Sequence, residues 1–456
     1  MNDAFHTDDL IQAPATPRGR SAVAIIRTSG EGCIEALSQV FSRPQVLMSS
    51  EGHRVHLGWL QSKEGERIDE VLVTVFRGPA SYTGEDSVEI SCHGGPTVVD
   101  RVLALFRSVG FRDAGPGEFT FRAFRNGKMD LTKAEAVREI IDSRTDRARA
   151  LAISRLAGSV SKVVDQAKAV VVHQSAVASL ALDYPDDEAE HVSFNLQALQ
   201  ETRNSLETLA KTWKTGRLYK EGLTVVLAGP ANAGKSSLFN LFLKEERSIV
   251  TERPGTTRDW LEAWLNLDGM PLRLVDTAGL REGSEDPIEQ EGIRRTRDVM
   301  KSADFVIAVA DGCAGASEAK RLEQEELAQL DDASRLIRVW NKADTAVTAP
   351  QGWIPVSALT GDGFTQLEQA IRLQALDGGL PPEGDAAVID SARQKSLLDR
   401  AVAAIDRFLE AEAQQIPADL LAEDLRDALD ALGELTGAVS RTDVLNKLFG
   451  EFCVGK

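Results

Sequence analysis

The sequence predicts three structural parts: an N-terminal α+β domain, a helical domain, and a doubly wound α/β domain inserted into the helical one. Residues 18–115 mix strand and helix patterns, whereas residues 222–377 alternate apolar strands with helices, as a parallel doubly wound sheet requires. Helical periodicity dominates on both sides of that alternation, over residues 130–215 and 391–449. Because both sets of helices carry apolar stripes that need a partner, we expect them to pack on each other.

The first part contains short strands and helices in turn. Apolar or alternating runs predict strands at residues 22–27, 70–76 and 87–92, and apolar residues at helical spacing predict helices over 31–41 and 97–109. Glu89 stands within a half-apolar strand. Composition alone favours a solvated face for that carboxylate.

Breaks in the pattern divide the chain. The acidic, proline-bearing residues 183–190 predict a loop between helices, and Pro381, Pro382 and Gly384 end the α/β alternation. The expected domains are residues 1–120, 121–218, 219–379 and 380–456, of which the second and fourth form the helical domain.

Composition limits the class of protein. The chain has 456 residues, is 43% hydrophobic and carries a net charge of −18, so its overall field repels nucleic acid. Any RNA must therefore be held by a local basic patch or a basic partner. The cysteines are scattered and form no C-x-x-C pair, which argues against disulfides and zinc and favours a reducing compartment: Cys33, Cys92, Cys313 and Cys453. The N-terminus lacks a signal-peptide core, and no apolar stretch is long enough to span a bilayer. We expect a cytoplasmic protein.

The most informative motif lies at residues 229–236, with the spacing G-x-x-x-x-G-K-S between an apolar strand and a helix. Backbone N–H groups of such a loop surround the phosphates of a nucleotide, and the helix N-terminus adds partial positive charge. Lys235 can reach the terminal phosphates, and the Ser236 hydroxyl can ligate Mg²⁺. The strand before and the helix after the loop argue against a chance glycine-rich turn.

Two later signals fit the same nucleotide. Thr257 lies where a switch segment would close on Mg²⁺ and sense the γ-phosphate. Asp276 ends a largely apolar strand, where it can hold the water shell of Mg²⁺, and the Gly279 N–H can meet the γ-phosphate.

Two more signals select the base. Asp344, in the motif N-K-A-D after another strand, can accept the ring N–H and the exocyclic amine of guanine, a donor pair that adenine lacks. Ser357 begins S-A-L, which is placed to cap the base with a backbone N–H. Five signals in this order predict a GTPase domain rather than an ATPase. The predicted nucleotide-binding residues are Asn232, Ala233, Gly234, Lys235, Ser236, Ser237, Thr251, Glu252, Arg253, Pro254, Gly255, Thr256, Thr257, Asp276, Thr277, Ala278, Gly279, Asn341, Lys342, Ala343, Asp344, Ser357, Ala358 and Leu359.

Hydrolysis needs an oriented water, which Ras-like switches hold with a glutamine directly after the D-x-x-G motif. Leu280 occupies that place here and cannot polarise water. We hypothesise that a monovalent cation supplies the missing positive charge, held by Asn232 in the phosphate loop and by oxygens from residues 251–256.

Motifs spread along the whole chain carry a family resemblance. The chain ends Gly450-Glu-Phe-Cys-Val-Gly-Lys456, and it contains A-T-P-R-G-R at 15–20, Y-T-G-E-D at 82–86, H-G-G-P at 93–96, P-G-E-F at 116–119 and N-G-K-M-D-L at 126–131. From about Ala13 to Lys456 it resembles the tRNA-modification GTPase family MnmE, also called TrmE. The resemblance implies a tetrahydrofolate-binding domain that also dimerises, a split helical domain and a GTPase domain.

Site residues follow from the resemblance by position. A tetrahydrofolate derivative, in its 5-formyl or 5,10-methylene form, would contact Arg27, Glu89, Lys128 and Lys456, which reverses the solvated-face interpretation of Glu89. K⁺ would be held by Asn232, Thr251, Arg253 through its carbonyl, and Thr256; Mg²⁺ would be held by Ser236 and Thr257. The catalytic glutamate would be Glu289, with Glu291 as the alternative because the preceding segment is one residue longer than is usual in the family. Arg253-Pro254 replaces a more apolar pair, and Val454 replaces an isoleucine.

Cys453 has three interpretations. It is a solvent-exposed tail cysteine, a prenylation site, or a catalytic group near the folate and the substrate, as the resemblance implies. Gly455 and Lys456 argue against the prenylation signal. We favour the functional role.

The resulting hypothesis is a potassium-dependent GTPase that works as a homodimer with the FAD-containing MnmG subunit and with tRNA. Together they would add a carboxymethylaminomethyl or aminomethyl group to the wobble uridine of certain tRNAs. The first alternative is a regulatory GTPase switch in ribosome assembly without modification chemistry. The second is a folate-dependent one-carbon transferase acting on a small molecule, with GTP as regulator.

Overall fold

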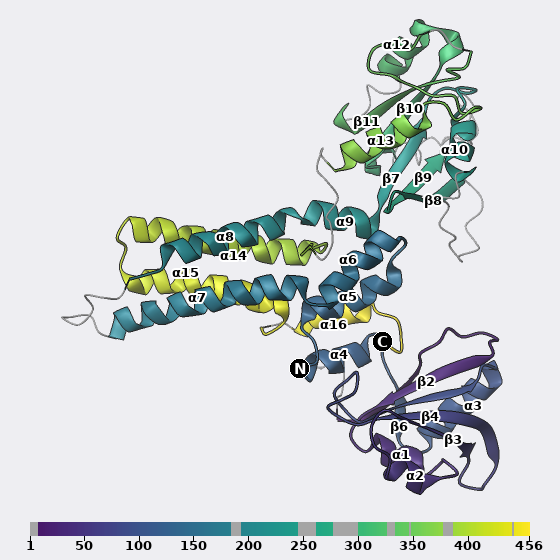
Figure 1. Ribbon diagram of the computed structural model, residues 1–456, viewed down its shortest axis with the longest axis vertical. Coiled ribbons are helices and arrows are strands. Elements are labelled where there is room, and N and C mark those ends of the chain that lie inside the picture. Colours follow the sequence, from purple (N-terminus) through teal and green to yellow (C-terminus); the bar gives the residue numbers. More distant parts are fainter. Residues whose placement is uncertain are drawn as a thin grey trace, which may run out of the picture. The chain divides into compact units, whose positions relative to one another are not determined.

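A computed structural model describes residues 8–183, 193–244, 261–276, 300–325, 333–345, 348–376, 386–439 and 442–456. These residues form two compact units (Figure 1). One comprises residues 1–141, 155–206 and 396–456, and the other comprises residues 142–154 and 207–395. Among the described residues, no helix combines the length and the hydropathy needed to cross a bilayer.

The first unit begins with a six-stranded sheet in the order β3-β4-β5-β2-β1-β6, in which only β1 and β6 pair in parallel. Its strands are β1 Leu10–Pro14, β2 Val23–Ser29, β3 Arg54–Gln61, β4 Arg67–Phe76, β5 Ser87–His93 and β6 Phe111–Asp113. The helices of this part are α1 Cys33–Ser38, α2 Pro44–Met48 and α3 Pro96–Arg107. Residues of α1 and α3 share one buried apolar cluster with β2, β4 and β5.

The apolar pattern predicts β2, β4, β5, α1 and α3, but it misses three strands. β1 carries the fully buried Gln12, and β6 has only three residues. β3 exposes Val55 and Leu57 by more than half, so its apolar residues do not mark the buried face.

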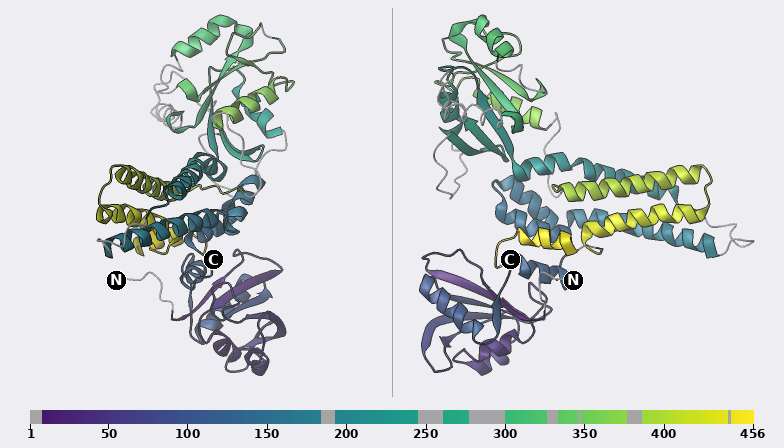
Figure 2. Two further views of the ribbon diagram at one scale, coloured as in Figure 1. Left: turned by 60° about the vertical axis from the view of Figure 1, so that its left-hand side comes forward. Right: turned by 180° about the vertical axis from the view of Figure 1, so that it is seen from behind.

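Helices from both sides of the inserted domain pack on each other in the first unit, as expected, although most of α6 belongs to residues 142–154 of the second unit. The elements are α4 Glu118–Arg125, α5 Leu131–Asp142, α6 Asp146–Leu156, α7 Ser159–Asp183, α8 Leu196–Lys211, α14 Ala392–Ala413, α15 Ala418–Thr436 and α16 Thr442–Gly450. Helix α15 runs along α7 in every view (Figures 1 and 2). Arg203 of α8 pairs with Asp406 of α14 at 2.9 Å. The predicted loop at 183–190 and the break at 381–384 lie largely or wholly outside the described residues.

The second unit is built on a sheet in the order β12-β11-β10-β7-β9-β8, parallel except for β8. Its elements are α9 Trp213–Glu221, β7 Leu223–Ala228, α10 Lys235–Lys244, β8 Leu261–Leu267, β9 Met270–Asp276, β10 Phe305–Asp311, α12 Ala316–Glu325, β11 Leu336–Asn341, β12 Ile354–Pro355 and α13 Phe364–Ala375, with short 3₁₀ turns at Gly312–Ala314 and Ala333–Arg335.

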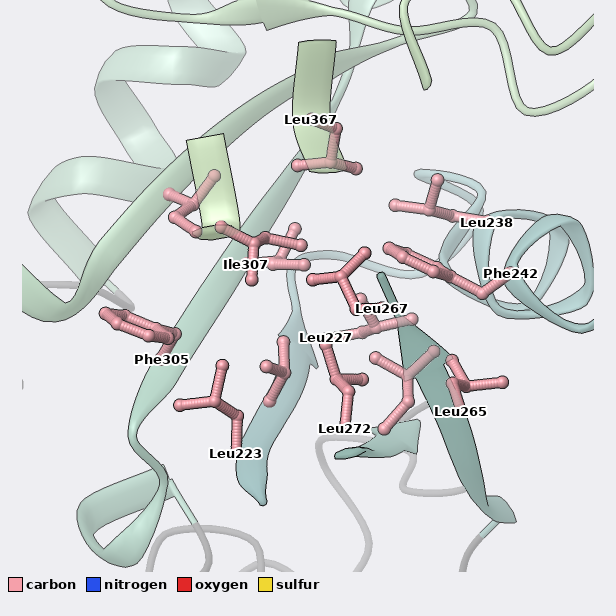
Figure 3. Close-up of a cluster of buried hydrophobic side chains, with 14 of the residues drawn as sticks. Leu223, Leu227, Leu238, Phe242, Leu265, Leu267, Leu272, Phe305, Ile307 and Leu367 are labelled. Carbon is pink, nitrogen blue, oxygen red and sulfur yellow. The ribbon is translucent and has the colours of Figure 1, made fainter. Parts of the chain in front are cut away.

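One apolar cluster fills the space between this sheet and helices α10 and α13. Leu223, Leu227, Leu272 and Ile307 contribute from the strands, and Phe242 and Leu367 from the helices (Figure 3). This α/β topology confirms the predicted doubly wound domain, and with the packed helices it confirms the predicted fold class. The exact domain boundaries stay a prediction.

Candidate functional site

The carboxyl ends of four parallel strands meet at one edge of the α/β sheet. Strand β7 ends before Gly229, β9 ends at Asp276, β10 at Asp311 and β11 at Asn341. Ligands of open α/β sheets bind at this edge, because the loops after the strands converge there. The described residues of the predicted nucleotide site therefore lie together at the carboxyl-end edge of the sheet.

The loop after β7 depends on backbone conformations that favour glycine. Gly229 has φ of 138°, and a Cβ there would lie 2.2 Å from the Val309 carbonyl oxygen. Gly234 has φ of 94°, and its Cβ would lie 2.0 Å from Nδ2 of Asn341. Asn232 also has a positive φ, of 68°, which asparagine tolerates better than most residues. The two glycines let the loop pass close to β10 and β11.

Lys235 is the first residue of α10 and is 8% exposed. Its Nζ donates to the carbonyl oxygens of Gly229 and Pro230, at 2.5 and 2.9 Å. The ammonium group is thus held inside the loop that the motif predicts will surround phosphates. Ser236 follows on the exposed side of the same turn.

Asn341 connects the loop to the predicted base-binding segments. Its Nδ2 donates to the Ala233 carbonyl at 2.8 Å, and its Oδ1 accepts from the Ala358 backbone N–H at 3.1 Å. The buried Ser357 donates its hydroxyl hydrogen to Oδ1 of Asp344 at 2.6 Å. Asn341 therefore positions the phosphate-binding loop relative to the base-binding segments. Leu359, which follows Ala358, is 86% exposed.

Asp311 belongs to the same edge, although no motif singles it out. It accepts from Lys342 Nζ at 2.6 Å and from the Cys313 backbone N–H at 3.0 Å. Burial opposes ionisation, but these two hydrogen bonds outweigh it and lower the pKa of the Asp311 carboxyl. The signal that could have found it is an acid ending an apolar strand, as at Asp276.

Several predicted residues lie outside the described residues. They are Thr251, Glu252, Arg253, Pro254, Gly255, Thr256, Thr257, Thr277, Ala278, Gly279, Glu289 and Glu291. Their roles stay predictions.

The hairpin of β8 and β9 is held by a segment from far earlier in the chain. Thr145 Oγ1 donates to the carbonyl of Gly269 at 2.7 Å, and a Cβ on Gly269 would lie 2.9 Å from Cβ of Arg147. The Arg144 guanidinium lies 3.7 Å from the ring centroid of Trp264. Strand β9 thus links this contact at one end with Asp276 at the other.

A second cluster forms in the first unit around the C-terminus. Arg27 and Glu89 are direct partners in the β2–β5 register, and Arg27 Nε donates to Glu89 Oε1 at 2.8 Å. Arg27 Nη1 donates to the Gly455 carbonyl at 3.2 Å. Burial lowers the pKa of Lys456, and so does the positive charge of Arg27, while Cys453 and Glu89 act in the opposite direction. Because Gly455 accepts from Arg27, the neighbouring Lys456 follows directly on the residue that contacts the Arg27–Glu89 pair.

Aromatic packing fixes the tail that carries these residues. Phe452 is 6% exposed and stacks 5.4 Å from the fully buried Phe449, in a cluster with Leu131 and Ala134 of α5. Val454 forms an isolated antiparallel bridge with Pro116, and the Gly117 N–H donates to the Cys453 carbonyl at 3.4 Å. The exposed Cys453 therefore stands on a segment that is held on both sides.

Lys128 lies against the segment of residues 79–86. Its Nζ donates to the Pro79 carbonyl at 2.7 Å, and its Cγ lies 3.3 Å from where a Cβ on Gly84 would be. The same 79–86 segment carries Tyr82, whose ring centroid lies 5.5 Å from the Arg27 guanidinium. The ring centroid of Phe119 lies 5.8 Å from the same guanidinium. The sequence motifs contain Tyr82 and Phe119, but only the structure shows that both rings lie near Arg27.

Residues 131–453 match the family described as the MnmE helical domain, and residues 10–128 match the GTP-binding protein TrmE N-terminus. The chain belongs to the MnmE family of tRNA modification GTPases. It is 42% identical over 453 residues to the tRNA modification GTPase MnmE of Akkermansia muciniphila, covering 98% of each chain. The same protein of Treponema denticola is 39% identical, with 99% of each chain covered.

Among solved structures, the chain is similar to the G domain of the Thermotoga maritima FeoB iron transporter, at 26% identity and a TM-score of 0.26. That match covers 34% of this chain and 98% of the other. Era of Aquifex aeolicus bound to GDP·AlF₄⁻ gives 23% identity and a TM-score of 0.28, covering 40% of this chain and 66% of that one. With the family established, the predicted resemblance is confirmed, and the protein is a GTPase of the tRNA modification class.

Proposed function

We propose that this protein is a potassium-dependent GTPase which, as a homodimer with an FAD-containing MnmG-type partner, modifies the wobble uridine of certain tRNAs. The pair adds a carboxymethylaminomethyl or aminomethyl group and draws its one-carbon unit from tetrahydrofolate. The observation that carries the proposal is the Arg27–Glu89 pair, whose arginine also donates to Gly455 beside Lys456; these residues belong to one compact unit, and the sheet edge with the nucleotide motifs belongs to the other. Two sites with different chemistry suit an enzyme that couples GTP hydrolysis to another reaction. We propose the cytoplasm as its location.

The residues at the sheet edge suit a GTP–Mg²⁺ complex. Lys235 offers a point charge, and Ser236 offers a hydroxyl at the start of α10, where partial positive charge favours phosphate. Asp276, which is 2% exposed at the end of β9, offers a carboxylate for the water shell of Mg²⁺. With Asp344 held by Ser357, guanine would be selected over adenine. Thr257, Glu289 and the ligands on residues 251–256 complete this proposal.

Asn232 suits a monovalent cation because its carboxamide oxygen is a hard ligand on an exposed loop. A bound K⁺ would supply positive charge to the phosphates during hydrolysis. Asn232 would hold the cation beside the loop. The cation would thus compensate for the water-orienting glutamine of Ras-like switches, whose place Leu280 occupies here. GTPase rates that are equal in sodium and potassium salts would contradict this part.

The donor set around Arg27 suits a folate. The Glu89 carboxylate can accept paired N–H groups of a pterin ring, Tyr82 and Phe119 offer aromatic faces, and Lys456 and Lys128 offer charges for a glutamate tail. A bound tetrahydrofolate would supply the one-carbon unit. Arg27 pairs with Glu89 at 2.8 Å and is its direct partner in the β2–β5 register, which fixes the position of the carboxylate.

A conformational change at the nucleotide site could reach the helical domain through strand β9. The Thr145–Gly269 hydrogen bond joins the hairpin to the start of α6, and α6 continues out of the nucleotide-binding unit. We propose that GTP hydrolysis shifts β9 and that α6 carries the shift toward the helical domain.

The test is mass analysis of wobble uridine in tRNA from cells that lack the protein. Unmodified nucleoside is expected, with rescue by the wild type but not by Lys235→Ala or Cys453→Ser. The Cys453→Ser protein should keep its GTPase activity, and loss of both activities would contradict the separate sites. Normal nucleoside with immature ribosomes would support the ribosome-assembly switch instead. Normal nucleoside with normal ribosomes would support a small-molecule transferase.

A further inference from the structure

The stretch from residue 10 to residue 30 differs in charge from the rest of the chain. It contains three arginines, Arg18, Arg20 and Arg27, and no acidic residue, whereas the whole chain has 70 acidic residues and a net charge of −18. Arg27 is already engaged with Glu89. Arg18 and Arg20 remain, on the connection between β1 and β2.

Arg18 and Arg20 belong to the minority of described arginines of this domain that form no ion pair, together with Arg43, Arg67 and Arg125. Arg43 instead donates to the Leu57 carbonyl at 3.1 Å, and Arg67 lies over the Trp59 ring. Arg27, Arg54, Arg77, Arg101, Arg107, Arg112 and Arg122 each form an ion pair. Arg18 and Arg20 are exposed, and within the described parts of the chain neither forms an ion pair or a hydrogen bond. Their charge is therefore available to an external anion.

The loop that carries them is anchored at both ends. The Ala15 N–H donates to the Ile25 carbonyl at 2.7 Å, and the Ile25 N–H donates to Thr16 Oγ1 at 3.2 Å. At the other end, the Ser21 N–H donates to the Gly94 carbonyl at 3.0 Å. A loop fixed in this way presents its arginines at lower entropic cost than a free tail would.

The neighbouring acid does not neutralise the loop. Asp69 lies under the turn that begins at His93, and its two oxygens contact the backbone N–H and Nδ1 of His93, at 2.8 and 2.6 Å. Its side chain is 9% exposed, whereas that of His93 is 72% exposed. Both carboxylate oxygens are therefore engaged by His93, the residue before the Gly94 that anchors the loop.

The loop also lies next to the C-terminal cluster, which comprises Arg27, Glu89 and the tail residues Gly455 and Lys456. A Cβ on Gly455 would be 2.6 Å from the Pro14 carbonyl oxygen and 3.4 Å from Cα of Ala15, the residue where the loop begins. Gly455 in turn accepts from Arg27. The loop that carries the free arginines thus begins beside the site that we propose for one-carbon chemistry.

We propose that Arg18 and Arg20 bind the phosphodiester backbone of the tRNA and so hold its anticodon arm at the C-terminal cluster. This inference rests on the proposed function for its substrate. The shape of the loop favours a macromolecule over the glutamate tail of a folate, because small ligands bind in concave sites. Gly19 between the arginines has no neighbouring atom within 4 Å of a Cβ. Guanidinium groups on such an open loop suit an extended polyanion.

The test compares two double variants of equal charge in the full-length protein. Arg18→Gln/Arg20→Gln removes the free pair, and Arg54→Gln/Arg101→Gln removes two exposed arginines that are already paired with Glu51 and Glu66. Binding of fluorescently labelled substrate tRNA is measured against salt, with and without the FAD-containing partner. The free-pair variant should bind about fivefold to tenfold more weakly, and its salt slope should fall by about 1.4. The control should stay within about twofold, because its arginines act on their own partners.

Two further measurements keep the result interpretable. GTPase rate and 5-formyltetrahydrofolate affinity should be unchanged in the free-pair variant, and Arg18→Lys/Arg20→Lys should keep most of the salt slope. Equal weakening in both double variants, or none in either, overturns the inference, and so does a loss confined to folate affinity. If the wild type binds no tRNA under any of these conditions, the proposed function fails, and the inference with it.

Discussion

The nucleotide site and the C-terminal cluster are assembled in opposite ways. At the sheet edge, each contributing group follows its own strand, and short motifs carry Gly234, Lys235, Asn341 and Asp344 with their neighbours. In the C-terminal cluster, Arg27 contacts a carbonyl of residue 455, near the far end of the chain. The first site depends on local conformation, whereas the second depends on whether the tail docks. Substitutions at the nucleotide site should therefore weaken ligand binding through backbone strain, and substitutions at the C-terminal cluster should weaken it through lost packing of the tail.

The largest expected difference is in the rate at which exposed and buried cysteines are alkylated. Burial raises the pKa of Cys33 to about 12 and that of Cys92 to about 11, so near pH 8 only about 10⁻⁴ and 10⁻³ of these thiols are ionised. Iodoacetamide should label the exposed Cys313 and Cys453 about a hundredfold faster than Cys92 and about a thousandfold faster than Cys33, as read by peptide mass spectrometry. The thiolate fraction of each buried cysteine should rise about tenfold per pH unit up to its pKa, with Cys92 labelled before Cys33.

Ligand protection sharpens the same experiment. Cys313 Sγ lies 3.3 Å from the hydroxyl of Thr345, next to the predicted base-binding Asp344. GDP should slow labelling of Cys313 only, and 5-formyltetrahydrofolate should slow labelling of Cys453 only. Protection of both cysteines by one ligand would mean that the two sites do not act separately.

Gly234→Ala should give the next largest effect. The added Cβ would have to fit 2.0 Å from Asn341 Nδ2 at a φ of 94°, so the loop or Asn341 must move. We expect GTP affinity to fall about a hundredfold or more and the nucleotide-binding unit to lose about 3 kcal/mol of stability. Titration with a fluorescent guanine nucleotide and thermal unfolding measure both.

Gly352→Ala is the matched control for that change. Its φ is 86°, but no atom lies within 4 Å of the added Cβ, so only the backbone strain of about 1 kcal/mol remains. If the two variants behave alike, strain alone explains the loss and the Asn341 contact does not matter.

Phe452→Ala tests the C-terminal cluster through packing. Truncating a buried aromatic ring costs about 3–5 kcal/mol, and here that cost falls on docking of the tail. Folate affinity, measured by calorimetry, should fall about tenfold or more, while guanine-nucleotide affinity stays unchanged. Val454→Ala removes a half-exposed side chain from the same tail and should change neither affinity. A loss of nucleotide affinity in Phe452→Ala would contradict the independence of the two sites.

Thr145→Val should give the smallest effect. It removes one buried hydrogen bond to Gly269, worth about 1 kcal/mol, and keeps the shape of the side chain. We expect GTPase rate within about twofold of wild type and a reduced yield of modified tRNA per GTP hydrolysed, measured with the reconstituted partner. Asp146→Asn removes an exposed ion-pair partner in the same segment and should leave that ratio unchanged. An unchanged ratio in Thr145→Val would exclude this contact as the route of motion.

The sequence by itself determined the fold class and the described part of the nucleotide edge. Gly229, Lys235, Asp276 and Asn341 each sit at the end of a strand or the start of a helix, and parallel strands bring such ends together whatever the rest of the chain does. The sequence did not predict Asp311, because a single acidic residue at the end of a strand does not indicate a site unless its partner, here Lys342, is known.

Only the tertiary structure decided what surrounds Arg27 and which arginines are free. The family resemblance named Arg27, Glu89, Lys128 and Lys456, but the aromatic rings near Arg27 and the docked tail depend on contacts between segments that lie far apart in the sequence. Composition counts every arginine alike. Whether a guanidinium is neutralised depends on the carboxylate that folding places beside it, and folding leaves Arg18 and Arg20 without one among the described residues.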